Sequence, residues 1–198
     1  MKRSILLPIL SILIVAAVLL GLSFGLKGVA AANAQAEHLR LMRTILPGSE
    51  NFTVELYSGD DANIRSVHKG ENGFVIETVT YGYGGEITML IGVSNAGTVT
   101  GLVVMDMSET LGLGSKALYD HEFLAQFLNS DGGIAIGTAG ETDAFSGATG
   151  SSDTETDTYV DGISGATVTS KAIARSINSA VAYVTGADVG SAATSWGG

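Results

Sequence analysis

The sequence predicts an α+β protein: a mainly antiparallel twisted sheet with packed helices, preceded by one N-terminal transmembrane helix. Three observations predict this class. Residues 4–26 form an uncharged apolar run, short β-type runs separated by turn formers lie between residues 53 and 107, and a helix with apolar periodicity covers residues 171–184. Strands that are followed by helices in this way are typical of a sheet whose helices are segregated to one face.

Length and composition limit the possible functions. The 198 residues allow one medium domain plus an anchor, and only 10 of them are Lys or Arg, which gives a formal net charge of −10. Without a basic surface, the chain is not expected to bind nucleic acid. The lack of Cys excludes disulfides, thiolate iron–sulfur ligation and Cys nucleophiles. His38, His68 and His121 are far apart along the chain and in no ligand spacing, so no metal site is predicted.

The N-terminal apolar run is long enough to cross a membrane. Residues 4–26 are about 23 residues, which at roughly 1.5 Å each cover a hydrocarbon core of about 30 Å. We predict a cytoplasmic N-terminus at residues 1–4 and a transmembrane helix at residues 5–26. A cleaved signal peptide is the alternative, because Ala32-Asn33-Ala34 resembles a cleavage site, but the run exceeds the roughly 7–15 apolar residues of such a peptide.

Charges beside this run predict its orientation. Lys2 and Arg3 precede it and only Lys27 follows closely, which favours a cytoplasmic N-terminus. We therefore expect a single-pass protein of the cytoplasmic (inner) membrane, in contact with lipid, with its soluble domain on the extracytoplasmic side.

The next elements follow from periodicity and turn formers. A stalk helix is predicted at residues 27–48, because an apolar stripe runs up to the helix-stopping pair Pro47-Gly48; the stripe consists of Leu39, Met42, Ile45 and Leu46. The main domain is predicted at residues 49–186. Its first strands are expected at residues 53–57, 63–69 and 73–81, and a hairpin at residues 86–93 and 98–107.

The second half of the domain is less regular. Ser115 can cap a helix that reaches about Leu128, with Leu118, Leu124 and Phe127 on its apolar face. Gly, Ser, Thr and Asp dominate residues 129–158, which contain no Lys or Arg, so we expect mostly an acidic flexible loop. Residues 187–198 are expected to form a flexible tail.

The stretch from Asp161 to Ser170 delivers a threonine to the start of a helix. A turn with Ser164 and Gly165 leads to Thr167, and the helix that follows carries apolar residues at helical spacing: Ile173, Ile177, Val181 and Val184. A helix N-terminus with nearby hydroxyl groups suits a phosphate group. Physical reasoning alone leaves an equal alternative, in which Thr169 or Ser170 merely caps the helix and Thr167 ends a strand.

Here the sequence resembles a known family. Asp161-x-x-Ser164-Gly165-Ala166-Thr167 is similar to the flavinylation motif of FMN-binding domains, in which a flavin transferase joins FMN to the threonine hydroxyl through a phosphoester. The resemblance implies that Thr167 is the acceptor, and that Asp161 orients the turn or helps the transferase.

The resemblance covers most of the chain. It includes the N-terminal run, Leu46-Pro47-Gly48, Gly82-Tyr83-Gly84-Gly85 and the segment from Glu109 to Gly114. Together these features resemble the G subunits of Rnf electron-transport complexes, which are related to the C subunits of sodium-pumping NADH:quinone oxidoreductases. The resemblance implies that the loop containing Glu109, Thr110, Leu111 and Gly112 lies by the flavin ring, although the family usually has Pro in place of Leu111.

A second copy of the motif is present. Asp143-Ala144-Phe145-Ser146-Gly147-Ala148-Thr149 fits the same pattern. Thr149 is followed by Gly150-Ser151-Ser152-Asp153, which cannot extend a helix and brings negative charge towards a phosphate, whereas a strong helix follows Thr167. We therefore predict Thr167 as the acceptor and Thr149 as a decoy or an occasional second site.

The resemblance implies a membrane-anchored electron-transfer subunit that carries covalent FMN in an ion-translocating ferredoxin:NAD oxidoreductase (Rnf) complex. Its expected partners are the other membrane subunits and, during maturation, the flavin transferase. We assign no catalytic residue, because electron relay needs no acid, base or nucleophile. The alternatives are a free-standing cell-surface flavin module that passes electrons to an extracellular acceptor, and a non-redox surface binding domain with Thr167 unmodified.

Overall fold

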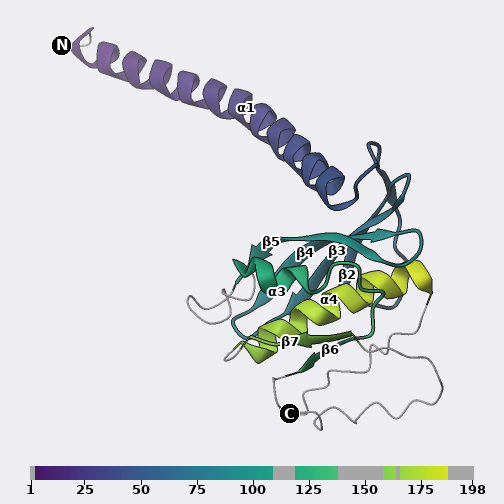
Figure 1. Ribbon diagram of the computed structural model, residues 1–198. Helices are drawn as coiled ribbons and strands as arrows, with labels where there is room; N and C mark the ends of the chain where they lie inside the picture. Colours follow the sequence, from purple (N-terminus) through teal and green to yellow (C-terminus); the bar gives the residue numbers. More distant parts are fainter. Residues whose placement is uncertain (1–2, 109–118, 138–157, 164–165, 187–198) are drawn as a thin grey trace. The chain divides into compact units, whose positions relative to one another are not determined.

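The computed structural model describes residues 3–108, 119–137, 158–163 and 166–186 (Figure 1). Six of the predicted positions, including the whole ring-contact loop, lie outside these residues: Glu109, Thr110, Leu111, Gly112, Ser164 and Gly165. The second motif copy with Thr149, the predicted cap Ser115, residue Leu118 and the predicted tail also lie outside them. The chain divides into two compact units, Met1–Leu41 and Met42–Gly198.

The first unit consists of helix α1, which spans Arg3–Ile45 and extends into the second unit. The predicted stalk is therefore helical as far as Ile45. The helix ends just before Pro47 and Gly48, because Pro47 lacks an N–H donor and Gly48 is conformationally flexible. Among the residues searched, which are the described ones, no helix is both long enough and apolar enough to cross a membrane. Much of the apolar run, residues 4–11 and 22–26, lies outside the described side chains.

A five-stranded antiparallel sheet forms the centre of the second unit. Its strands follow the chain order, with each strand paired to the next: β1 (Thr53–Glu55), β2 (Ile64–Lys69), β3 (Gly73–Tyr81), β4 (Glu86–Ser94) and β5 (Val99–Met107). The predicted hairpin is confirmed, since β4 and β5 pair in antiparallel register from Ile87 opposite Met107 to Val93 opposite Val99.

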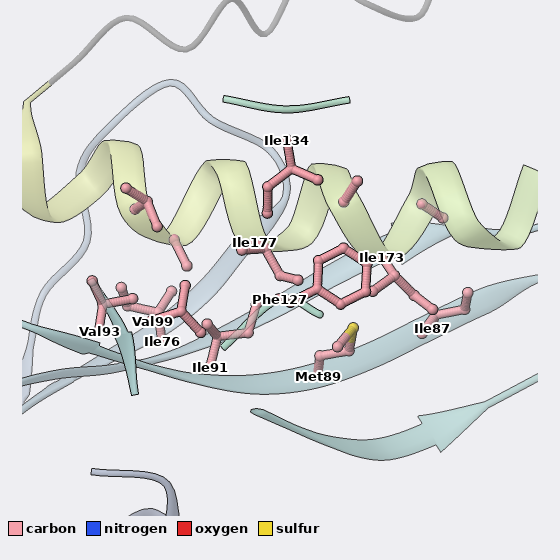
Figure 2. Packing of buried hydrophobic residues seen from close by; sticks show 14 of the residues in the cluster. Ile76, Ile87, Met89, Ile91, Val93, Val99, Phe127, Ile134, Ile173 and Ile177 are labelled. Atoms are coloured by element: carbon pink, nitrogen blue, oxygen red, sulfur yellow. The ribbon is translucent and has the colours of Figure 1, made fainter. Parts of the chain in front are cut away.

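The main core lies between this sheet and helix α4 (Thr167–Thr185), which packs along β3 and β4. Alternate residues of β4 point towards the helix, as Figure 2 shows for Ile87, Met89 and Ile91. They meet Ile173 and Ile177 of α4, which are fully buried. Burial of each such side chain contributes about 1.5–3 kcal/mol, so this layer holds α4 against the sheet.

The end of α1 packs on a glycine pair of the sheet. Met42, Ile45 and Leu46 from the predicted apolar stripe are buried. Gly92 and Gly101 are paired across β4 and β5, and both lie against the backbone of Ile45. The Thr100 hydroxyl donates to the Ile45 carbonyl oxygen at 2.5 Å, which satisfies one of the carbonyl groups left unpaired at a helix end.

The segment after β5 differs from the prediction. The described helix here, α3, spans only His121–Ala125 and is capped by Asp120, whose carboxylate accepts from the N–H groups of Glu122 and Phe123. A short turn then leads to the buried Phe127. The helix therefore ends before Leu128. Asp120 caps its first turn, and the chain leaves the helix before the buried Phe127, so the apolar spacing up to Leu128 does not continue the helix.

The prediction of an acidic loop over residues 129–158 is wrong for the first part of that range. Ile134–Gly137 form strand β6, which pairs in parallel with β7 (Thr158–Asp161), the strand that leads to the motif. The Asn178 side chain on α4 accepts from the N–H of Ile134 and donates to its carbonyl oxygen, at 3.1 and 3.2 Å. This long-range pairing organises a segment whose composition alone suggests a loop.

Candidate functional site

Thr167 is the first residue of α4, and its side chain is partly exposed. The residue before it, Ala166, occupies the cap position and is buried, and among the described residues no side-chain hydrogen bond caps the helix. The alternative in which Thr169 or Ser170 caps the helix is wrong, since both lie within its first turn and are fully buried. Thr167 does not end a strand either, because β7 ends at Asp161.

Three hydrogen bonds among the described residues hold the turn between β7 and α4. The Asp161 N–H donates to Gln126 Oε1 at 3.2 Å, and the Ala166 N–H donates to the Ile163 carbonyl oxygen at 2.9 Å. The Ile163 N–H donates to the Ser170 hydroxyl oxygen at 3.4 Å. The buried first turn of α4 therefore closes the turn that presents Thr167, while the Asp161 side chain is exposed.

A buried polar contact fixes the register of α4 on the sheet. Thr80 on β3 donates to the Ala172 carbonyl oxygen at 3.1 Å, and its hydroxyl lies 2.9 Å from that of Ser176. All three residues are buried. Because β-branched Thr has few rotamers and its hydroxyl needs a partner in the core, this contact determines how far the helix start extends past the strand.

The start of α4 and the end of β5 lie at the same end of the sheet. Thr80 pairs with Ile87, and Ile87 pairs with Met107. The Ser108 N–H then donates to the Glu86 carbonyl oxygen at 2.9 Å. The segment that contains the predicted Glu109 loop therefore leaves the sheet at the end where Thr167 is presented, although residues 109–118 themselves are not described.

The chemistry of this helix start suits a phosphate ester. The first N–H groups of a helix have no partner within the helix and carry partial positive charge. Helix α4 has no acidic residue in its first turn, and no carboxylate of the described residues caps it. A hydroxyl on the first residue, flanked by small Ala166, fits a phosphate group in size and charge. Among the described residues, no cluster of His, Asp or Glu could hold a metal ion.

Three residues shape this region in ways that the sequence does not predict. Ser170 closes the turn, and Gln126 holds the end of β7. Arg175 Nη2 donates to the carbonyl oxygen of Tyr81, at the end of β3, at 3.1 Å. A buried serine within an apolar helix face is a usable signal for Ser170. No local pattern marks Gln126 or Arg175, because their partners are distant in the sequence.

Comparison with known proteins identifies the family. The family model for the FMN-binding domain matches residues 82–182. The G subunit of an ion-translocating oxidoreductase complex from Methanosarcina acetivorans is 33% identical over 181 residues, which cover 86% of this chain and 87% of that protein. The G subunit of the Na⁺-translocating ferredoxin:NAD⁺ oxidoreductase complex from Acetobacterium woodii is 30% identical over 112 residues, which cover 55% of this chain but only 47% of that protein.

Among solved structures, the C subunit of the Na⁺-translocating NADH-quinone reductase from Parabacteroides distasonis is similar, with 23% identity, a TM-score of 0.42, and coverage of 60% of this chain and 59% of that chain. The family model spans both the Gly82–Gly85 turn and most of α4, as far as Ala182. On the strength of that match and of the nearly full-length M. acetivorans relative, the chain belongs to the FMN-binding domain family.

Proposed function

We propose that this protein is the FMN-carrying electron-transfer subunit of an ion-translocating ferredoxin:NAD oxidoreductase complex. Membership of the FMN-binding domain family supports the cofactor, and the names of the M. acetivorans and A. woodii relatives support the type of complex. The protein needs no catalytic acid or base for this role. Its residues have to hold the flavin, set its surroundings and exclude competing reactions.

We further propose that the flavin is attached covalently to Thr167. The observation that carries this proposal is the position of Thr167: it is the first residue of α4, it is partly exposed, and it follows the turn that Ser170 closes. During attachment the hydroxyl oxygen of Thr167 would bond to the phosphorus of an activated flavin nucleotide, with loss of the hydroxyl proton and of the leaving group on phosphorus. The N–H groups of the helix start would then stabilise the phosphoester charge.

FMN supplies one- and two-electron redox chemistry when it is bound. The chain contributes position: Thr80 and Ser176 fix α4 on the sheet, and the turn after Asp161 fixes Thr167 on α4. Ser164, Gly165, Glu109, Thr110, Leu111 and Gly112 remain proposed contacts of the cofactor. In the sequence they adjoin the described residues Ser108, Ile163 and Ala166.

The membrane anchor is part of the same proposal. The uncharged run at residues 4–26 supports a single span, and the charges at Lys2 and Arg3 support a soluble domain on the extracytoplasmic side. The proposed partners are the other membrane subunits, the lipid around the span and, during maturation, the flavin transferase.

The proposal is tested by intact mass after coexpression with a flavin transferase. The wild-type chain should gain the mass of one FMN less one water, and its denatured gel band should fluoresce. Thr167→Ala should lose both signals, whereas Thr149→Ala should keep them. Flavin that remains in Thr167→Ala and disappears in Thr149→Ala would move the acceptor to the second motif copy, and an unmodified wild-type chain would favour a non-redox surface domain.

A second experiment separates a component of a complex from a free-standing carrier. The chain is purified in detergent with an affinity tag at its C-terminus. Copurification of multispanning membrane subunits supports the complex, and a flavinylated chain that is recovered alone supports the surface module.

A further inference from the structure

Arg175 occupies an unusual position on α4. It lies two turns after Thr167, about 12 Å along the helix axis. Its Nη2 atom donates to the carbonyl oxygen of Tyr81, the last residue of β3, at 3.1 Å. Its Nε atom is buried and has no hydrogen-bond partner among the described residues. Burial also lowers the pKa of the guanidinium.

These contacts of Arg175 contribute little to the stability of the fold. Arg175 is partly exposed, but its buried Nε loses hydration that the single hydrogen bond from Nη2 to a neutral carbonyl does not replace. What the bond does accomplish is geometric. It ties the end of β3, and so the β3–β4 turn (Gly82–Gly85), to the helix that presents Thr167.

The β3–β4 turn also contacts the other segment expected at the site. The Gly82 N–H donates to the Gly85 carbonyl oxygen at 2.8 Å, so the turn is tight. Gly85 has φ +154°, and a Cβ atom there would lie 2.9 Å from the Ser108 carbonyl oxygen. Ser108 is the last described residue before the predicted ring-contact loop. The turn therefore lies between the helix that carries Thr167 and the point where that loop begins.

The turn carries an aromatic ring that packs on little within the described structure. Tyr83 is 78% exposed. Thr80 points towards α4, so by strand alternation the ring of Tyr81 points to the opposite face of the sheet. Exposed tyrosine rings provide planar apolar surface with a polar tip, and they stack on flat ring systems.

We infer that the β3–β4 turn forms a wall of the flavin site, with the ring of Tyr83 against the flavin ring, and that Arg175 is the positioning residue that holds this wall. The inference rests on the proposed attachment of flavin to Thr167. It gives a role to the Gly82-Tyr83-Gly84-Gly85 motif, which the proposed function leaves without one.

The first test uses the protein before flavin attachment. Hydrogen exchange of the amides at residues 82–86 should become about tenfold faster in Arg175→Met than in the wild type, since a charge-assisted hydrogen bond that holds the turn is lost. Arg175→Lys should restore part of the protection. Lys171→Met removes the same charge one turn earlier on α4 and should leave the exchange unchanged. Equal exchange in Arg175→Met and the wild type would overturn the positioning role.

The second test uses the flavinylated full chain, with attachment verified by intact mass. A phenol ring against an excited flavin quenches its fluorescence by electron transfer, so Tyr83→Leu should raise the fluorescence at least about twofold. Tyr81→Leu, on the opposite face, should not change it. Tyr83 is exposed, so its replacement leaves the core intact. Unchanged fluorescence in Tyr83→Leu with flavin attached overturns this inference alone, whereas a chain without the flavin mass overturns the proposed function from which it follows.

Discussion

Gly92 lies directly against the last turn of α1: a Cβ atom at Gly92 would lie 2.4 Å from the carbonyl oxygen of Ile45. Its cross-strand partner Gly101 is also close, with a Cβ position 2.7 Å from Ile45 Cα. The glycine pair therefore lets the helix end approach the sheet backbone closely enough for Thr100 to bond to the Ile45 carbonyl oxygen.

Gly92→Ala should destabilise the soluble domain by about 1–3 kcal/mol, because backbone atoms cannot move aside as a flexible side chain can. Gly28→Ala is the matched control. Gly28 lies in α1 with no atom within 4 Å of its Cβ position, so this change should be neutral or slightly stabilising. Thermal unfolding in detergent measures both, and equal transition temperatures for the two variants would contradict the close contact.

Glu71 should make the stability of the region after α1 depend on pH. Its pKa is lowered by a hydrogen bond from its own backbone, by the Asn51 side chain and by the N–H groups of Asn51 and Glu50, which outweigh desolvation. A carboxylate whose pKa falls on folding stabilises the protein above its unfolded pKa, and this contribution disappears as the pH drops through the folded pKa.

Glu71→Gln should therefore be less stable than the wild type at neutral pH, and the difference should shrink to nothing under acidic conditions. Urea unfolding at a series of pH values measures the difference. Glu37→Gln, at an exposed position of α1, controls for the loss of one negative charge. A difference that stays constant down to acidic pH would show that the Glu71 carboxylate makes no such contribution.

Thr80 and Ser176 should behave as a coupled pair. Thr80→Val removes the donor to the Ala172 carbonyl oxygen and leaves the buried Ser176 hydroxyl with one partner fewer, so a loss of about 1–3 kcal/mol is expected. Ser176→Ala removes only the hydroxyl contact and should cost less. The double variant should lose less than the sum of the two single losses, because the orphaned group is then absent. Additive losses in urea unfolding would indicate that the two hydroxyls do not interact.

Local patterns predict the parts of this fold that local chemistry determines. The β4–β5 hairpin follows from two β-rich runs around a short turn, and α4 follows from the spacing of Ile173 and Ile177. Strand β6 could not be predicted in this way, since its four residues are stabilised by β7 and by Asn178, both remote in the sequence. The same reason hides the contact between Arg175 and Tyr81.

At the candidate site too, local sequence predicts some features, and others depend on contacts that are remote in the sequence. The motif and the helix that follows it predict Thr167 as the acceptor, and α4 does begin there. The competing idea of a Ser or Thr cap is equally consistent with local chemistry. The cap interpretation is wrong because Thr169 and Ser170 lie inside the helix and face the core. Which face of α4 is buried depends on its packing against β3 and β6, which local sequence does not reveal.

Ser170→Ala should impair flavin attachment more than it impairs stability. The Ser170 hydroxyl is the acceptor for the Ile163 N–H, so its loss frees the turn that presents Thr167 while it removes a single weak hydrogen bond. Ser179→Ala is the matched control, because it removes another buried serine hydroxyl from the same helix, farther from the turn. With limiting transferase, intact mass should show a lower flavinylated fraction in Ser170→Ala than in Ser179→Ala, even though the two variants unfold at similar temperatures. Equal flavinylated fractions would mean that the transferase reshapes the turn itself, and that the pre-formed geometry before Thr167 does not control attachment.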